Sequence, residues 1–306
     1  MRSQAASGIA LILLAVLAFA LLDSAVKVLS AGVPLLLVVW TRYAAQAVLV
    51  GGWLRFHPVA RRRPPVRHPR FQVLRGTLLL TTSVLAFLGL RELPVAEFTA
   101  IAMLAPVFVT LASPWLLKEP VGALRWALVT LAFTGGLLVV RPGSAVFTPA
   151  ALLPLALAVC GAMFQLLTRH MAALEDPLRT HGTTGAVGLV WLTVALAAWP
   201  GAWWPTLLQI APWQWALMAT AGLLGTFGHL AFIVGTRRAP LPVLMPFTYA
   251  QLVFAGLLGL WVFGQRPDGW ALAGMALIAA SGAVAAWVNV RGGRGSPVAA
   301  DAAVGD

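Results

Sequence analysis

Long apolar runs dominate the chain, and short polar or proline-containing connections separate them. A helix needs about 20 mostly apolar residues to cross the hydrocarbon core of a bilayer. The runs that approach this length predict ten transmembrane helices, over residues 8–29, 34–54, 75–91, 95–117, 123–140, 150–170, 182–200, 212–235, 240–263 and 270–290. The pattern therefore predicts an all-α polytopic membrane protein.

Composition agrees with this prediction and excludes several classes of protein. Of the 306 residues, 60% are hydrophobic and only 10% are charged, whereas soluble domains have about a quarter charged residues. The single cysteine, Cys160, excludes a disulfide framework. The histidine spacings show no metal-ligand pattern, so we expect no metal and no cofactor. Most of the +12 net charge lies between apolar runs, above all in residues 55–70. This placement favours a cytoplasmic loop beside a lipid bilayer over a nucleic-acid surface.

The positions of the basic residues also predict the orientation of the chain. Most of the 21 lysines and arginines flank the segment ends that share a side with the N-terminus. The opposite side holds only Lys27, Arg91, Arg141 and Arg266, and Arg42 lies within the second segment. By the positive-inside rule both termini are cytoplasmic. We expect a multi-pass protein of a bacterial-type plasma (inner) membrane, with a disordered cytoplasmic tail over residues 292–306.

A weak internal repeat divides the chain into two halves. LRELPVAEFTA…WLLKEPVG (90–122) aligns with TRRAPLPVLMP…WVFGQRPDG (236–269) at an offset of 147 residues. Sequence rich in Leu and Gly gives some matches by chance, but the shared segment spacing favours a repeat over residues 1–145 and 146–291. Each half contains five segments. Because five is odd, the second half must be inverted, which is a transporter architecture.

Four stretches together resemble the EamA-type transporters of the drug/metabolite transporter superfamily. They are FALLDSAVK (19–27), VVWTRYAAQ (38–46), LPVAEFTAIAMLAPVFVTLASPWLLKEP (93–120) and PFTYAQLVFAGLLGLWVFGQRPD (246–268). The resemblance covers about residues 8–290, and it implies secondary transport of a small metabolite such as an amino acid, frequently outward. The chain departs from the family at Gln265 and Arg266, where the family often has a glutamate before the proline.

Charged residues within the apolar segments are the first candidates for a binding site, because each is costly in a bilayer. Asp23 and Lys27 share one helix face at i and i+4. Arg42 falls at similar depth, and Glu97 lies near the outer start of the fourth segment. These groups could line a substrate pathway and meet the carboxylate and ammonium of an amino acid. Alternatively, Asp23 and Lys27 form a structural ion pair, with Lys27 reaching the headgroups.

Polar residues nearer the middle of the membrane form a second set of candidates. They are Gln165, His229, Tyr249 and Gln251. Each could hydrogen-bond a solute in a shared cavity, and each could equally join two helices. Pro246 could bend the ninth segment and expose polar groups to that cavity. His181, at the start of the seventh segment, is expected at the interface.

Two classes of function are compatible with these patterns. We favour a secondary carrier that exports a small polar or amphipathic metabolite by alternating access around a central cavity, with a homodimer allowed. The alternative is an intramembrane enzyme acting on lipid or peptide. No nucleophile with a neighbouring base and no metal motif is visible in the sequence, so we expect no catalytic residues and no enzyme activity.

Overall fold

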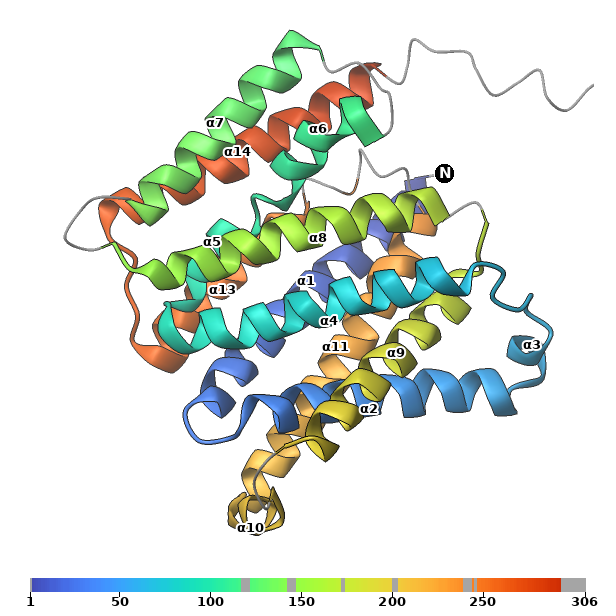
Figure 1. Ribbon diagram of the computed structural model, residues 1–306. Helices are drawn as coiled ribbons and strands as arrows, with labels where there is room; N and C mark the ends of the chain where they lie inside the picture. Colours follow the sequence, from blue (N-terminus) through green and yellow to red (C-terminus); the bar gives the residue numbers. More distant parts are fainter. Residues whose placement is uncertain are drawn as a thin grey trace, which may run out of the picture.

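The computed structural model describes residues 2–116, 122–141, 147–171, 174–199, 203–238, 244 and 247–292. Over these residues every regular element is helical (Figure 1). The helices are α1 (Arg2–Ser30), α2 (Leu35–Phe56), α3 (Pro58–Arg61), α4 (Pro69–Glu92), α5 (Val95–Ala102), α6 (Ala105–Leu116), α7 (Ala123–Val140), a 3-10 turn (Pro149–Ala151), α8 (Leu152–Met171), α9 (Pro177–Ala197), α10 (Trp203–Gln209), α11 (Pro212–Arg238), α13 (Ala250–Phe263) and α14 (Gly269–Gly292). Pro246 and tail residues 293–306 lie outside the described residues.

Six helical stretches are long and apolar enough to cross a membrane. They are Ala6–Ser30, Leu35–Phe56, Pro69–Glu92, Val95–Ala112, Pro149–Thr168 and Pro212–Gly235. Three shorter apolar helices cover Trp126–Val140, Ala250–Phe263 and Gly269–Ala285. Large apolar side chains face outward, among them Trp261 (74% exposed) and Val48 (69%). An apolar exterior of this kind suits lipid, so the prediction of a polytopic membrane protein is confirmed.

The fourth predicted segment is not one continuous helix. It breaks at Met103 and Leu104 into α5 and α6. The break places Pro106 in the first turn of α6, where the missing proline N–H has no partner to lose. The backbone N–H of Val107 then bonds to the carbonyl of Leu104 at 2.9 Å. The fourth predicted segment therefore consists of two helices, α5 and α6, within one candidate span, Val95–Ala112.

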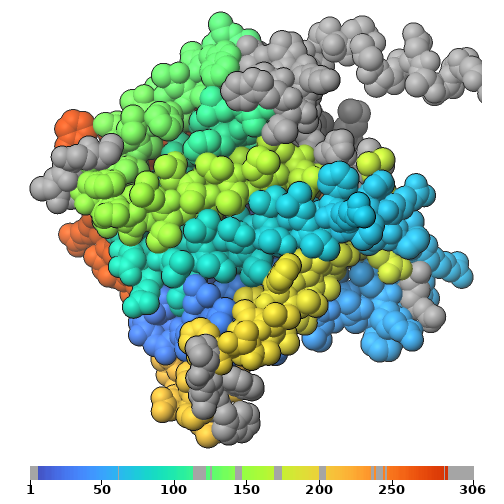
Figure 2. All heavy atoms as spheres, viewed as in Figure 1, coloured from blue at the N-terminus to red at the C-terminus, as the bar shows by residue number. Residues whose placement is uncertain are grey.

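Four pairs of helices make the most extensive contacts: α1 with α11, α7 with α14, α2 with α9, and α4 with α8. In Figure 1, α7 and α14 lie side by side at one end of the molecule, beyond α5 and α8. In the space-filling view, α8, α4 and α9 cover the face toward the viewer (Figure 2). Three of these four pairs join a helix before residue 117 to one after residue 150.

Two glycines set the distance between α7 and α14. A Cβ atom built on Gly135 would lie 2.7 Å from the Gly274 carbonyl oxygen, and one on Gly274 would meet the Gly135 carbonyl oxygen. No side chain fits between these backbones. Close approach at small residues is a common mode of helix association in membranes, where lipid is as apolar as the helices and packing supplies the attraction.

Candidate functional site

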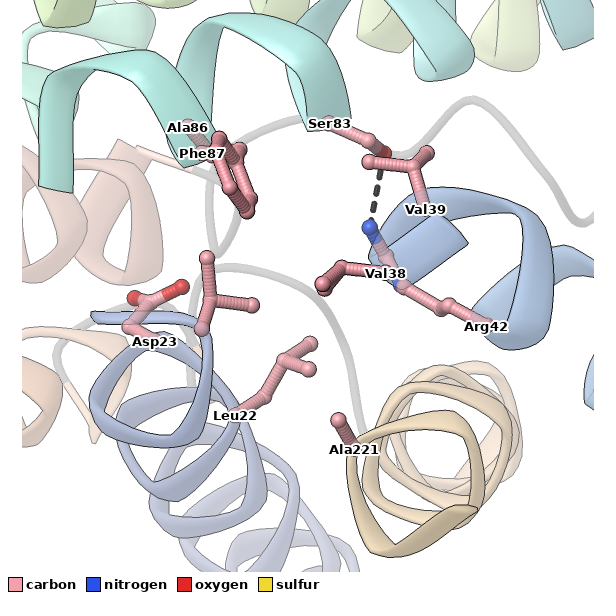
Figure 3. A pocket seen from close by; sticks show the side chains of 10 residues that line it. Leu22, Asp23, Val38, Val39, Arg42, Ser83, Ala86, Phe87 and Ala221 are labelled. Atoms are coloured by element: carbon pink, nitrogen blue, oxygen red, sulfur yellow. Dashed lines mark hydrogen bonds between the residues drawn. The ribbon is translucent and has the colours of Figure 1, made fainter. Parts of the chain in front are cut away.

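A buried cavity of about 30 Å³ lies between α1, α2, α4 and α11 (Figure 3). A cavity of this volume holds one or two water molecules and no metabolite. Its lining is mostly apolar, but it includes one acid and one base. The lining residues are Leu22, Asp23, Val26, Val38, Val39, Arg42, Ser83, Ala86, Phe87 and Ala221.

Asp23 lies on the α1 side of this cavity (Figure 3). Its hydrogen-bond partner is Gln251 on α13, whose Nε2 donates to Asp23 Oδ2 over a long 3.4 Å. The contact brings together two predicted site residues that are 228 positions apart. A single long bond leaves most of the acceptor capacity of the carboxylate unused.

Arg42 lies on the α2 side of the same cavity, held by a neutral partner. Its Nη1 donates to Ser83 Oγ at 2.6 Å. Ser83 Oγ donates its own proton to the Leu79 carbonyl and lies 3.1 Å from the Tyr43 hydroxyl. The Ser83 hydroxyl therefore donates one hydrogen bond and accepts two, which is its full capacity. On the other side, α11 presents Gly225, where a Cβ would lie 3.0 Å from Arg42 Nε, so the glycine makes room for the guanidinium.

Asp23 and Arg42 thus face each other across the cavity without closing an ion pair (Figure 3). Ser83 holds the guanidinium from the α4 side, and Gln251 holds the carboxylate from the α13 side. Two opposite charges kept apart in an apolar setting are costly unless something else compensates them.

Lys27 is not paired with Asp23. Its Nζ donates instead to the carbonyls of Leu90, at 2.7 Å, and Leu93, at 2.6 Å. These carbonyls end α4, and a cation is favourable at the end of a helix, where carbonyls lack intrahelical partners. Lys27 also lines a hollow of about 550 Å³ with Val28, Ser30, Ala31, Arg91 and Phe263. The hollow adjoins the C-terminal end of α1, beyond Asp23.

Glu97 belongs to a separate group of charges where α7 ends and α14 begins. Arg141, with a left-handed backbone (φ 48°), ends α7, and its Nη1 lies 2.8 Å from Asp268 Oδ2. Asp268 also accepts from the Ala271 backbone N–H at 2.8 Å at the start of α14. The Ala271 hydrogen bond, followed by the Arg141 partner, lowers the pKa of Asp268. Glu97 lies near this pair and not in the cavity.

Gln265, where the chain departs from the family pattern, has a structural contact. Gly264, with φ 64°, ends α13 in the left-handed conformation that glycine adopts without strain. The Gln265 side chain then reaches α5, where its Oε1 accepts from the Val95 N–H at 3.1 Å. Lys27 and Gln265 therefore hold the α4–α5 junction from two sides.

Two predicted site residues lie away from the cavity. The ring of Tyr249 packs against α14 at Gly282, within the apolar cluster that includes α7. Gln165 is exposed on α8. In this arrangement neither side chain lines the cavity with Asp23 and Arg42.

His229, the remaining predicted residue, belongs to an inner polar layer. Its Nδ1 lies 2.9 Å from the Gly225 carbonyl, and its ring stacks at 5.9 Å on His181 of α9. His181, which lies near the start of α9, is packed inside the protein and is only 2% exposed. Gln46 of α2 binds it, donating from Nε2 to the His181 carbonyl at 2.9 Å.

Arg75 and Gln72 on α4 complete the inner layer. Arg75 is 6% exposed and donates from Nη1 to Thr184 Oγ1 at 2.6 Å and from Nε to Thr168 Oγ1 at 2.7 Å. Gln72 donates to Thr180 Oγ1 at 2.9 Å. Arg75 follows Gln72 by three residues, and Ser83 follows Arg75 by eight. At 3.6 residues per turn, this spacing places all three on one face of α4.

The basic loop before α4 is bound to the turn before α9. Glu175 Oε1 accepts from the backbone N–H groups of Arg67 and His68, at 3.0 and 2.8 Å. Asp176 caps α9 and pairs with Arg63 at 2.6 Å. Partial burial raises the pKa of Asp176. The hydrogen bonds from the Arg179 and Leu178 backbone N–H groups, together with Arg63, outweigh this effect and hold that pKa below its ordinary value.

Apolar helices, buried charges around a small cavity and a polar layer on one side of it define a polytopic membrane protein with a polar interior. No group of three or more potential metal ligands occurs in the described parts of the chain. The profile of the EamA-like transporter family matches residues 6–141 and 148–287. The chain therefore belongs to the EamA-like transporter family, within the drug/metabolite transporter superfamily, and is a transporter rather than an enzyme.

Relatives in this family are named for different solutes. A riboflavin transporter of Vibrio cholerae is 27% identical over 87% of this chain and 88% of its own. An S-adenosylmethionine uptake transporter of Rickettsia prowazekii is 23% identical over 65% of this chain and 66% of its own. A pseudopaline exporter of Pseudomonas aeruginosa is 25% identical, over 89% and 93%. The names cover uptake and export.

A solved crystal structure of a protein superposes with a TM-score of 0.64, covering 94% of this chain and 98% of its own. The two sequences are 22% identical. At this identity the likeness concerns the fold alone.

Proposed function

We propose that the chain is a secondary carrier built from two inverted five-helix repeats, residues 1–145 and 146–291, that cross the membrane ten times. Helix pairing supports this plan. If the fifth helix along corresponds to the tenth, and the second to the seventh, then the pairs α7–α14 and α2–α9 each join equivalent helices. In the same scheme α1 corresponds to α8 and α4 corresponds to α11. The pair α1–α11 is then equivalent to the pair α8–α4. A two-fold relation between halves is the usual basis of alternating access.

The proposed substrate is a small metabolite that carries an ammonium and a carboxylate, as an amino acid does. One observation carries this proposal: Asp23 and Arg42 face one cavity from opposite sides, and each is held by a neutral partner. The ammonium would approach Asp23 and the carboxylate would approach Arg42, whose fork suits a carboxylate. Gln251 belongs to this site through Asp23.

The solutes named for relatives are consistent with this chemistry in part. S-adenosylmethionine carries an amino-acid group with both charges, whereas riboflavin carries no net charge. We therefore place the recognition at the amino-acid group and make riboflavin the competing solute in the test. A homodimer, cytoplasmic termini and the inner membrane are further parts of the proposal.

Transport in this proposal requires the cavity to enlarge. A volume of about 30 Å³ excludes any metabolite, so substrate must separate α1 from α2 and α4. The outer hollow beside Lys27 lies on one side of the cavity, and the Glu175 and Asp176 contacts close the other. The structure then corresponds to a contracted state with the cytoplasmic end shut. Export is the proposed direction.

The test is counterflow in proteoliposomes with three labelled probes: L-methionine, S-adenosylmethionine and riboflavin. We expect saturable exchange of at least one amino-acid probe, with an apparent affinity that falls more than about tenfold in Asp23→Asn and in Arg42→Gln. Ser24→Ala is the matched control, since Ser24 is buried beside Asp23 and bonds only to Ala20 of its own helix. Riboflavin exchange with unchanged affinity in both charge variants would contradict the proposed substrate class.

Direction is tested separately with inside-out vesicles. Export predicts that probe added at the cytoplasmic face accumulates inside these vesicles under an imposed ion gradient. Accumulation only in right-side-out vesicles would contradict export and leave the substrate class standing.

A further inference from the structure

Arg75 is a buried cation without a buried anion. Its two donor bonds go to Thr168 and Thr184, and each of these hydroxyls already donates its own proton to a backbone carbonyl. The threonines therefore act as acceptors for Arg75 and bring no negative charge. Within the described residues no carboxylate forms an ion pair with Arg75. Its Nη2 also has no hydrogen-bond partner among them.

The ring of Phe164 lies 4.4 Å from the guanidinium carbon of Arg75. Two threonines and one aromatic ring fix the plane of the fork and leave the Nη2 end open. A buried cation that is oriented but uncompensated is the arrangement of a receptor for an anion.

His181, near Arg75, offers a second donor. The carbonyl of His181 can only accept, so the Gln46 group that binds it at 2.9 Å is the amide nitrogen. The same nitrogen lies 3.3 Å from His181 Nδ1, which must then act as the acceptor and leave the ring proton on Nε2. That Nε2 is buried without a hydrogen-bond partner of ordinary length, and the backbone of Thr226 is the polar group that acts on the ring.

Gln72, one turn before Arg75, offers an acceptor. Its amide nitrogen donates to Thr180 Oγ1, and its Oε1 is fully buried without a hydrogen-bond partner. Arg75, His181 and Gln72 together leave two donors and one acceptor unpaired in one layer. A carboxylate with a neighbouring ammonium has the complementary set.

The inner layer also adjoins the cavity that Asp23 and Arg42 line. His229 stacks on His181 and bonds to Gly225, against which the Arg42 side chain lies. The charges of both Arg42 and Arg75 act on the two histidine rings, so both rings lie near both arginines. Polar groups therefore extend from Arg42, past the two histidines, toward Arg75.

We propose that Arg75 and His181 form a second, inner binding site for the carboxylate end of the transported solute, beside which Gln72 Oε1 accepts from its ammonium. The carboxylate passes from Arg42 to Arg75 when the carrier opens toward the cytoplasmic side. The inference rests on the proposed function, because it assigns the inner station of the same solute. The two histidines line the passage between the stations.

The experiment measures thermal unfolding of the purified full chain with propionate or propionamide, at sodium concentrations matched with sodium chloride. The two probes have nearly the same shape, and only propionate carries the charge. We expect propionate, and not propionamide, to raise the Tm by mass action. Arg42→Gln should keep part of this shift, and the double variant with Arg75→Gln should lose it. Arg70→Gln, an exposed arginine on the same helix, is the matched control.

Two milder variants serve if Arg75→Gln does not fold. Arg75→Lys keeps the charge but loses the fork, and His181→Phe keeps a stacking ring but loses the Nε2 donor. Each should weaken the propionate effect at least about tenfold in the Arg42→Gln background. Unchanged propionate affinity in both would overturn the inner site.

The outcomes separate the two proposals. If Arg42→Gln removes the whole propionate effect and Arg75→Gln removes none, the inner site is overturned and the outer site stands. If Arg75→Gln removes the whole effect and Arg42→Gln none, the inner site stands and the outer role of Arg42 fails. If neither variant changes the response, both carboxylate assignments are wrong.

Discussion

Arg42 Nη1 donates to Ser83 Oγ at 2.6 Å, and this bond turns the guanidinium toward α4 while Asp23 occupies the far side of the same cavity. The relationship explains how two opposite charges coexist in one small apolar space without neutralising each other. A serine can accept from arginine without carrying charge, so the base stays available. Ser83 is therefore a positioning residue for the proposed site.

Replacing Ser83 by alanine should release Arg42 toward Asp23. The ion pair that then forms competes with substrate for both charges, and the KM for counterflow should rise about tenfold while the unfolding temperature changes little. Thr82→Ala is the control, because Thr82 lies on the same helix and bonds only to the Leu79 carbonyl. Equal KM values in the two variants would contradict the positioning role.

Gln265→Leu should destabilise the protein by about 1–3 kcal/mol, because it leaves the buried Val95 N–H without an acceptor. Gln265→Glu keeps an oxygen at the same place and should retain most of the stability. Thermal unfolding in detergent measures both. If leucine and glutamate have the same effect, the hydrogen bond to α5 does not support the junction.

Gly135→Ala and Gly274→Ala should each force α7 and α14 apart, because the new methyl group meets a backbone carbonyl that cannot move aside independently. Overpacking of this kind costs about 1–3 kcal/mol. Gly256→Ala on α13 is the control, since a Cβ there meets nothing within 4 Å. A lower midpoint for the first two variants than for the control, in a thermal or chemical unfolding assay, is the expected result.

Asp176 should make stability depend on pH at the acidic end. Its pKa in the folded protein is below the ordinary value of 3.8, so its contribution is complete above that value and is lost as pH falls through the lowered pKa. Asp176→Asn should reduce the unfolding midpoint at pH 7, and the difference from wild type should vanish at the acidic limit. Asp176→Ser restores an N-cap without the charge and so separates the cap from the Arg63 pair. A constant difference at every pH would contradict this assignment.

Much of the fold could be predicted because lipid imposes a length and an apolar composition on each crossing helix. The placement of Asp23 and Arg42 at similar depth was also accessible, since depth follows from counting residues along a helix. Which side of a helix faces which neighbour was not accessible. In a membrane the lipid side and the packed side are both apolar, so periodicity does not distinguish them.

That ambiguity explains why the candidate residues do not all lie together. Gln165 and Tyr249 have site-like chemistry but point to the surface and to α14. Helical spacing allowed Lys27 to pair with Asp23, yet the free carbonyls at the end of α4 compete for it. Arg75 and His181 lie near segment ends, so the sequence alone did not mark them as members of one buried layer. Their partners, such as Thr184 and Gln46, come from distant segments that hydropathy alone cannot bring together.

The pairing of α1 with α11 has a consequence for how the chain assembles. Helices enter a membrane in the order of synthesis and associate afterwards. The first helix must therefore wait, with Asp23 and Lys27 already in the bilayer, until the residues around 212–238 and 250–263 arrive to cover it. The loop before α4 similarly waits for Glu175. A chain that stops before residue 212 would therefore leave Asp23 without Gln251 and α1 without the helix that covers it.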